Sequence, residues 1–263
     1  MLPLAAEKFP VTPDELAVAV TAGFAARGVE VESLRAEGAA LSELAVLTVG
    51  LTGARFTRGF RISSKPVTDA AAVLIERLEI TGAPLDFEGM PLSVRVEAER
   101  AELRFAGEPG DGALVLAGAA SGSVVLAVAQ SALENLLYRL AKDAAEKQGV
   151  EIKKTALELT ARGPRALAFR CAVTAKMFVL SADLSLSGNL DVDDQLNARV
   201  SGLTLGGDAM ITKLAAGFVR PQLDKLEGRV IPLLAMAPGG LPLRDVEIST
   251  REGLEVRAKF RRG

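Results

Sequence analysis

The sequence predicts an α+β protein in which long, curled antiparallel β-sheets wrap around long amphipathic helices. A helix-like segment that ends at a glycine and leads into a strand occurs twice, near each end of the first 150 residues. The strands that follow alternate between apolar and polar residues over unusual lengths. Hydrophobic residues make up 49% of the 263 residues but aromatic ones only 4%, so the interior is aliphatic. Two similar units in tandem would form one elongated, tubular body.

The first helix is expected over residues 12–27. Thr12 is followed by a proline and, three residues on, by Glu15, which is the pattern of a capping box. Gly28 then supplies the left-handed exit from the helix. Its apolar stripe consists of Leu16, Val20 and Phe24.

The second helix is expected over residues 131–148, where Ser131 and Glu134 repeat the capping box and Gly149 repeats the exit. Its apolar stripe consists of Leu133, Leu136, Leu137 and Leu140. The recurrence predicts two repeats, residues 1–129 and residues 130–263. The second repeat would add a C-terminal helix from Gly207 to Phe218, with Ile211, Leu214 and Phe218 on one face, and closing strands.

Two stretches alternate long enough to be exceptional strands. Residues 180–193 place leucine, alanine and valine on one face and serine, aspartate and asparagine on the other, about twice the usual strand length of ~5 to 6 residues. Residues 92–105 alternate as well, but the phase changes at Arg100. Such a change is typical of a β-bulge, and bulged strands twist and coil.

Residues 112–133 carry no charge and are long enough to cross a bilayer as a helix. The run is interrupted by Ser121, Gly122 and Ser123, so it divides into two short segments, 113–116 and 124–128. We therefore expect two buried strands around a turn rather than a membrane span. Whether this stretch contacts a membrane stays open.

Histidine is absent, which excludes Ser-His and Cys-His nucleophile pairs and conventional zinc sites. The acidic group at Asn189, Asp191, Asp193 and Asp194 lacks the glycine and the closing glutamate of a calcium loop, so we expect no metal and no cofactor. The single cysteine, Cys171, lies among apolar alternation partners and is interpreted as a buried, inert thiol. A net charge of −2 with scattered cations makes nucleic acid a poor candidate partner.

A resemblance adds to this pattern. Residues 187–260 are similar to the closing half of the tubular lipid-binding superfamily, which includes the bactericidal/permeability-increasing proteins, and most of all to the bacterial LmeA-like phospholipid-binding family. The residues that carry it are the segments 190–194, 200–207, 218–221, 240–246 and 253–256, which match in apolar spacing rather than in a diagnostic motif. The resemblance implies a hydrophobic cavity between helix and curled sheet that accepts acyl chains. It brings no catalytic residues.

The expected function is therefore non-enzymatic binding of a lipid or another long-chain ligand, for carriage or sensing, with transient contact to a membrane surface. The candidate cavity wall consists of Leu16, Val20, Phe24, Leu133, Leu137, Leu140, Leu184, Leu186, Ile211, Leu214 and Phe218. Candidate headgroup contacts are Arg257, Lys259 and Arg261 on the last strand, and a second group at Arg55, Arg58, Arg61 and Lys65. The helical stripes could equally be core, and the cations could be a solvated strand face.

Two other functions stay open. A tandem hot-dog thioesterase also pairs a helix with a curled sheet, and it would need a carboxylate at a helix start, where Asp14, Glu15 and Glu134 are available. A scaffold protein with a filled core would have no room for a chain. No secretory signal is legible in residues 1–10, so the sequence as it stands predicts a cytoplasmic protein, or a periplasmic or envelope protein if it has been processed. The sequence does not determine the oligomeric state.

Overall fold

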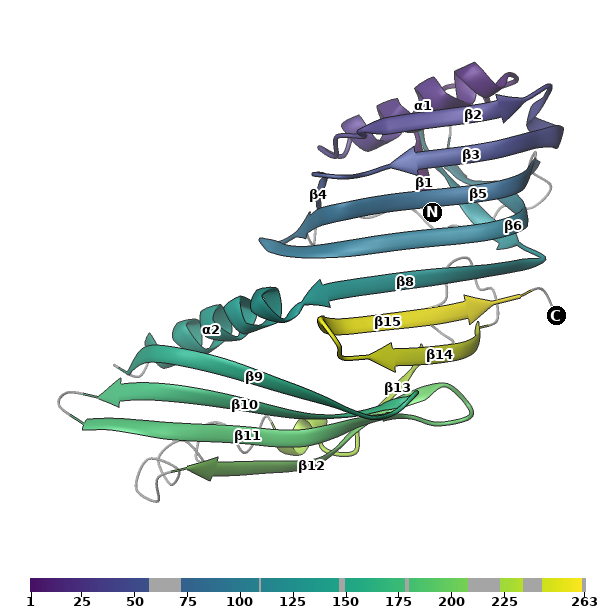
Figure 1. Ribbon diagram of the computed structural model, residues 1–263. Coiled ribbons are helices and arrows are strands. Elements are labelled where there is room, and N and C mark those ends of the chain that lie inside the picture. The colour runs from purple at the N-terminus through teal and green to yellow at the C-terminus, as the bar shows by residue number, and fades with distance from the viewer. Residues whose placement is uncertain are drawn as a thin grey trace. The chain divides into compact units, whose positions relative to one another are not determined.

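The structure is a computed structural model that describes residues 1–56, 72–108, 110–146, 150–177, 180–207, 223–233 and 243–261. These residues form two compact units (Figure 1). Unit 1 takes its residues from 1–127, 243–245 and 257–261, and unit 2 takes its residues from 128–233 and 246–256. The chain first passes from unit 1 to unit 2 after residue 127. The C-terminal strands, however, are divided between the two units.

The described residues of unit 1 form a mixed β-sheet and helix α1. Its elements are β1 (Leu2–Leu4), α1 (Pro13–Ala25), β2 (Ser33–Gly38), the 3-10 turn η1 (Leu41–Glu43), β3 (Leu44–Gly50), β4 (Arg55–Phe56), β5 (Ala72–Phe87), β6 (Met90–Glu108), β7 (Asp111–Gly118), most of β8 (Ser121–Ala129), and parts of β14 (Leu243–Ser249) and β15 (Gly253–Phe260). The strand order is β14-β15-β8-β6-β5-β3-β2. β7 pairs with β6 and β1, and β4 pairs with β5. β3 and β4 run parallel to β5, while the other pairs with a recorded register in this sheet are antiparallel.

The β-bulge expected at Arg100 is absent from the pairing of β6 with β5, but the backbone of β6 changes conformation there. Arg100 has a φ of 47°, in the left-handed region. Before it, residues 93–99 pair with β8; after it, residues 102–108 pair with β7. Pairing with β5 keeps its register across this point. On the side away from β5, β6 therefore pairs with β8 before Arg100 and with β7 after it.

The core of unit 1 is closed. Leu16 and Val20 of α1 are 0% exposed and Phe24 is 3% exposed. They share one buried cluster with β1, β3, β5, β6 and β7, which contribute residues such as Leu47 and Leu114. The stripe of the first helix, predicted as either core or cavity wall, thus packs in a filled interior.

The predicted cap of α1 has the expected geometry. Thr12 is extended, with φ −120° and ψ 158°, and its Oγ1 accepts a hydrogen bond from the Glu15 N–H at 3.2 Å. The Glu15 carboxylate accepts one from the Val11 N–H at 2.8 Å, one residue before the position of an ordinary capping box. The left-handed exit predicted at Gly28 is also present, with a φ of 71°.

We expect Thr12→Ala to lower the free energy of unfolding by about 1 kcal/mol, because the Glu15 N–H loses its side-chain acceptor. Urea denaturation followed by circular dichroism measures the change. Thr12→Ser, which keeps a hydroxyl, is the matched control and should stay close to the original stability. Equal stability of the alanine and serine variants would contradict a capping role.

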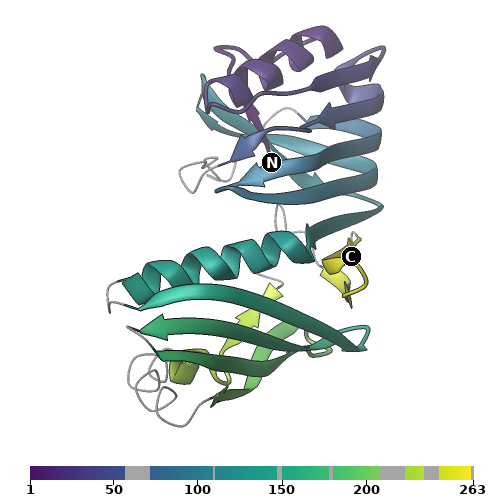
Figure 2. The ribbon, with the colours of Figure 1, turned by 60° about the vertical axis from the view of Figure 1, so that its left-hand side comes forward.

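The described residues of unit 2 form an antiparallel meander, with helix α2 beside it and a short helical segment at residues 223–226. Its elements are the end of β8, α2 (Gln130–Glu146), β9 (Glu151–Gly163), β10 (Ala166–Met177), β11 (Leu180–Val192), β12 (Asn197–Gly207), β13 (Val230–Pro232), and the remaining parts of β14 and β15. The strand order is β13-β12-β11-β10-β9, and each neighbouring pair is antiparallel. α2 runs alongside β9 (Figure 2). The long strand predicted at 180–193 is β11.

The predicted fold class is wrong. Strands account for most of the described residues, and the sheets are not strongly curled around long helices. In the part of the chain that the structure describes, the helical segments are α1, α2, η1 and residues 223–226. The two units also differ, since the unit 1 sheet is mixed and the unit 2 sheet is antiparallel. A period of two reveals that one face of a strand is apolar, but it does not reveal which element covers that face.

The uncharged stretch 112–133 forms strands, as predicted. It comprises most of β7, all of β8 and the first residues of α2. Among the described residues, no helix is both long and apolar enough to span a membrane.

The predicted start of the second helix is displaced. α2 begins at Gln130, directly after β8, so Ser131 lies inside the helix instead of capping it. The Glu134 carboxylate accepts hydrogen bonds from the Leu157 N–H of β9, at 3.2 Å, and from the Gln130 side-chain amide, at 3.3 Å. The predicted exit at Gly149 and the predicted third helix, Gly207 to Phe218, lie outside the described residues except for Gly207, which ends β12.

Candidate functional site

The apolar face of the unit 2 sheet is the most distinctive surface among the described residues. Strand register aligns Leu157, Cys171, Leu186 and Leu205 in one row across β9, β10, β11 and β12. The neighbours on this face extend the row, and we call the whole set the leucine face: Leu157, Leu159, Phe169, Cys171, Val173, Leu184, Leu186, Leu203 and Leu205. Phe169 and Leu203 converge over Gly188, where a Cβ would lie 2.8 and 2.7 Å from their side chains. Glycine therefore allows these two side chains to approach each other across β11.

The leucine face is only partly covered. Leu157 is buried, at 7% exposure, while Cys171, Leu186 and Leu205 are half-buried. Leu184, the other predicted wall residue on this sheet, is half-buried too. An aliphatic row that keeps water contact across three strands is costly, because burying apolar surface is the main favourable term in folding.

α2 lies on the side of β9 that carries the leucine face. The Thr155 side chain, which pairs with Val173 on that face, donates a hydrogen bond to the Glu134 carbonyl at 3.2 Å. Leu157 points its backbone groups toward α2: its N–H donates to the Glu134 carboxylate at 3.2 Å, and its C=O accepts from the Gln130 amide at 2.8 Å. These bonds satisfy part of the open edge of β9 and fix the helix in place.

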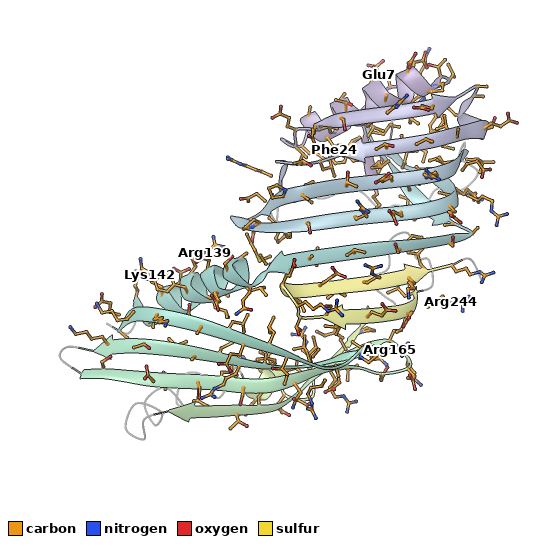
Figure 3. All side chains as sticks on the ribbon, in the orientation of Figure 1. Glu7, Phe24, Arg139, Lys142, Arg165 and Arg244 are labelled. Carbon is orange, nitrogen blue, oxygen red and sulfur yellow. The ribbon has the colours of Figure 1, made fainter. Side chains whose placement is uncertain are left out.

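The apolar stripe of α2 is less buried than that of α1. Leu133, Leu136 and Leu137 are half-buried, and Leu140 is 55% exposed. The cations Arg139 and Lys142 lie on the exposed side of the helix (Figure 3). Two helices with similar stripes in the sequence thus differ in burial, and only the stripe of α2 reaches solvent.

Cys171 lies on the leucine face rather than in a closed core. Its side chain is half-buried, and burial raises the pKa of its thiol. A raised pKa leaves little thiolate at neutral pH, which agrees with the expectation of low reactivity. Because it is the only cysteine of the chain, it can report on this face.

The remaining predicted wall residues fall elsewhere. Leu16, Val20 and Phe24 lie in the core of unit 1. Ile211, Leu214 and Phe218 lie outside the described residues. The predicted cavity wall is therefore not one surface, and of its members only those on α2 and β11 lie at partly open apolar positions.

The predicted headgroup cations lie on unit 1. Arg257, Lys259 and Arg261 are exposed and alternate with inward residues, of which Phe260 is 2% exposed. Lys259 pairs with Asp245 at 3.7 Å. From the second cationic group, Arg55 is exposed on β4, while Arg58, Arg61 and Lys65 lie outside the described residues.

The opposite face of the unit 2 sheet, which sequence reasoning did not single out, is hollowed. Two shallow depressions of about 410 and 270 Å³ share Arg170 in their lining. The lining of the larger depression includes the small side chains of Ala156, Ala172 and Ser185. In the sequence, small alanine and serine side chains at alternate positions were the signal that could have predicted these depressions.

Of the carboxylates considered for catalysis, Glu15 and Glu134 have structural partners. Glu15 accepts from Val11 and Glu134 accepts from Leu157, both through backbone N–H groups. Hydrogen bonds from Asn197 lower the pKa of Asp193, which organises the turn after β11. No group of three metal-binding side chains occurs within the described ranges.

Comparisons with protein-family models, with curated proteins and with solved structures found no match. The resemblance to the tubular lipid-binding superfamily therefore gains no support from them and stays a prediction based on apolar spacing.

Proposed function

We propose that unit 2 binds the aliphatic chain of a lipid or a similar long-chain ligand, without transforming it. The observation that carries the proposal is an aliphatic row in which Leu157 is buried but Cys171, Leu186 and Leu205 are only half-buried, beside a helix whose Leu140 is 55% exposed. The row spans three inter-strand spacings, about 14 Å at ~4.8 Å each. A single extended chain lying across the strands would cover it.

Aliphatic contact alone can supply the binding energy. Each methylene moved from water into apolar surroundings contributes about 0.8 kcal/mol, so even partial cover of a chain offsets the cost of ordering it. With no aromatic side chain on this face other than Phe169, contacts would be non-directional. We therefore expect preference for chain length and little preference for chain chemistry.

Unit 1 has a different role in this proposal. Its α1 stripe is packed in a filled core, so unit 1 contributes stability rather than a second chain site. The scaffold function that the sequence left open thus fits unit 1, while ligand binding fits unit 2.

The test is lipid uptake by the purified full chain. After incubation with phosphatidylcholine vesicles, native mass spectrometry should detect bound phospholipid, and bound lipid should slow modification of Cys171 by a maleimide. Leu186→Asp should reduce uptake at least tenfold, because a carboxylate in the row must be desolvated by the chain.

Ser187→Asp is the matched control, since it places the same carboxylate at the next position of β11 on the opposite face. It should take up lipid as the original chain does. Unchanged lipid uptake by a folded Leu186→Asp variant would refute the proposal. It would also be refuted if the original chain bound no lipid and its Cys171 reacted at the same rate with and without vesicles.

A further inference from the structure

β13 and the turn before it form an exposed apolar ridge at the edge of the unit 2 sheet. We define the β13 ridge by Leu226, Val230 and Ile231, which are 42%, 45% and 36% exposed. Val230 pairs with Arg199 and Ile231 with Ala198, so successive side chains leave opposite faces of β13. The exposed apolar surface therefore lies along the edge of β13 and includes side chains from both faces of the strand.

The ridge is held in place from within. The Glu227 carboxylate accepts hydrogen bonds from the N–H groups of Gly202 and Leu203 on β12, at 2.9 and 2.8 Å. The Gly228 N–H donates to the Val200 carbonyl at 2.9 Å. Leu223, 9% exposed, anchors the start of the turn. Leu226 thus projects from a turn that is bonded to the sheet, and Val230 and Ile231 project from the edge strand that follows it. Exposed apolar side chains grouped in this way indicate an interaction site.

Two cations accompany the ridge. Lys225 and Arg229 are exposed and form no ion pair with any residue that the structure describes. Glu227, which lies between them in the sequence, is turned into β12, and Asp224 is the other acid of the turn. Lys225 and Arg229 therefore lie beside exposed aliphatic side chains, with no ion-pair partner among the described residues.

We propose that the β13 ridge docks unit 2 on an anionic membrane surface. Aliphatic side chains flanked by lysine and arginine suit the boundary between lipid headgroups and acyl chains, where the cations meet phosphates. Each cation near an anionic surface strengthens binding about fivefold. This inference refines the proposed lipid binding, but it depends on different residues and can fail separately.

A protein partner fits the ridge less well. Pairing with a strand from another chain would use the open edge of β13, but this strand has only three residues and ends in Pro232, features that blunt sheet edges. The ridge also lacks the tryptophan and tyrosine residues that dominate protein interfaces. The combination of aliphatic and cationic side chains favours a lipid surface.

The experiment is co-sedimentation of the full chain with vesicles of phosphatidylcholine alone and of phosphatidylcholine with 30% phosphatidylglycerol. We expect binding to the anionic vesicles only, weakened by added salt. The double variant Lys225→Glu with Arg229→Glu should bind at least about 25-fold more weakly, as should Val230→Asp with Ile231→Asp. Lys8→Glu with Arg77→Glu changes the net charge equally at exposed positions of unit 1 and should bind as the original chain does.

Equal binding by the ridge and control variants, or no binding of the original chain to anionic vesicles, would overturn the proposal. So would a dimer in light scattering that Ile231→Asp converts to a monomer, since the ridge would then be an interface between copies of the chain. The ridge variants should still extract phospholipid at high vesicle concentration, whereas Leu186→Asp should not. This difference separates failure of docking from failure of chain binding.

Discussion

Leu16→Asp is expected to unfold unit 1, whereas the same substitution at Leu140 is expected to leave the chain folded. Leu16 is 0% exposed and is packed in the closed core of unit 1. A carboxylate there would be desolvated without a partner, which lowers the free energy of unfolding by more than about 4 kcal/mol. That loss is comparable to the whole stability of many domains.

Leu140 is the matched position on α2, in the corresponding apolar stripe but 55% exposed. A carboxylate there stays hydrated, so we expect a stability change within about 0.5 kcal/mol. Thermal unfolding followed by circular dichroism, with the yield of soluble protein, measures both variants. Similar losses for the two would mean that α2 is as much a core helix as α1, and the proposed chain site in unit 2 would lose its basis.

Local periodicity predicted much of the secondary structure. Strict alternation predicted β11, and the uncharged stretch with its central serines predicted β7 and β8. These features depend on residues that are neighbours in the sequence. The cap at Thr12 succeeded for the same reason.

What failed depends on contacts between distant residues. Ser131 and Glu134 have the spacing of a capping box, but β8 runs directly into α2, and the β9 backbone, 23 residues further along, competes successfully for the Glu134 carboxylate. Likewise, nothing local indicates that β3 lies parallel to β5. The fold class was wrong because it assumed that long helices cover the apolar faces of the strands. Tertiary packing decides which element covers such a face.

The candidate site was predictable in part. Leu184 and Leu186 stood out through their own alternation, and the stripe of α2 through its helical spacing. Cys171 and Leu205 did not, because their alignment with Leu186 is a property of strand register, which a single strand does not encode. The sequence also could not separate the stripes of the two helices, since burial depends on what packs against them.

Gly23→Ala is expected to destabilise the chain, although the same change in a helix interior ordinarily stabilises it by about 0.5 to 1 kcal/mol. Gly23 lies in α1 where the helix crosses β1, and a Cβ there would lie 2.6 Å from the Pro3 carbonyl carbon and oxygen and 2.7 Å from the Leu4 nitrogen. These are backbone atoms of a strand that is paired with β7 and bonded to α1 through the Ala5 N–H and the Ala19 carbonyl. Neither side can move without losing those bonds.

The clash should therefore outweigh the gain in helix propensity. We expect a net loss of about 1 to 3 kcal/mol for Gly23→Ala, and a larger loss for Gly23→Val, whose branched side chain cannot turn away from β1. Urea denaturation measures both. Ala22→Gly, at the adjacent exposed position, is the control, and there glycine should be the less stable residue by about 0.5 to 1 kcal/mol. If alanine were instead the better residue at both positions, α1 and β1 would not be in close backbone contact. The description of the unit 1 core as closed would then be wrong. The assignment of unit 1 as a supporting unit depends on that description.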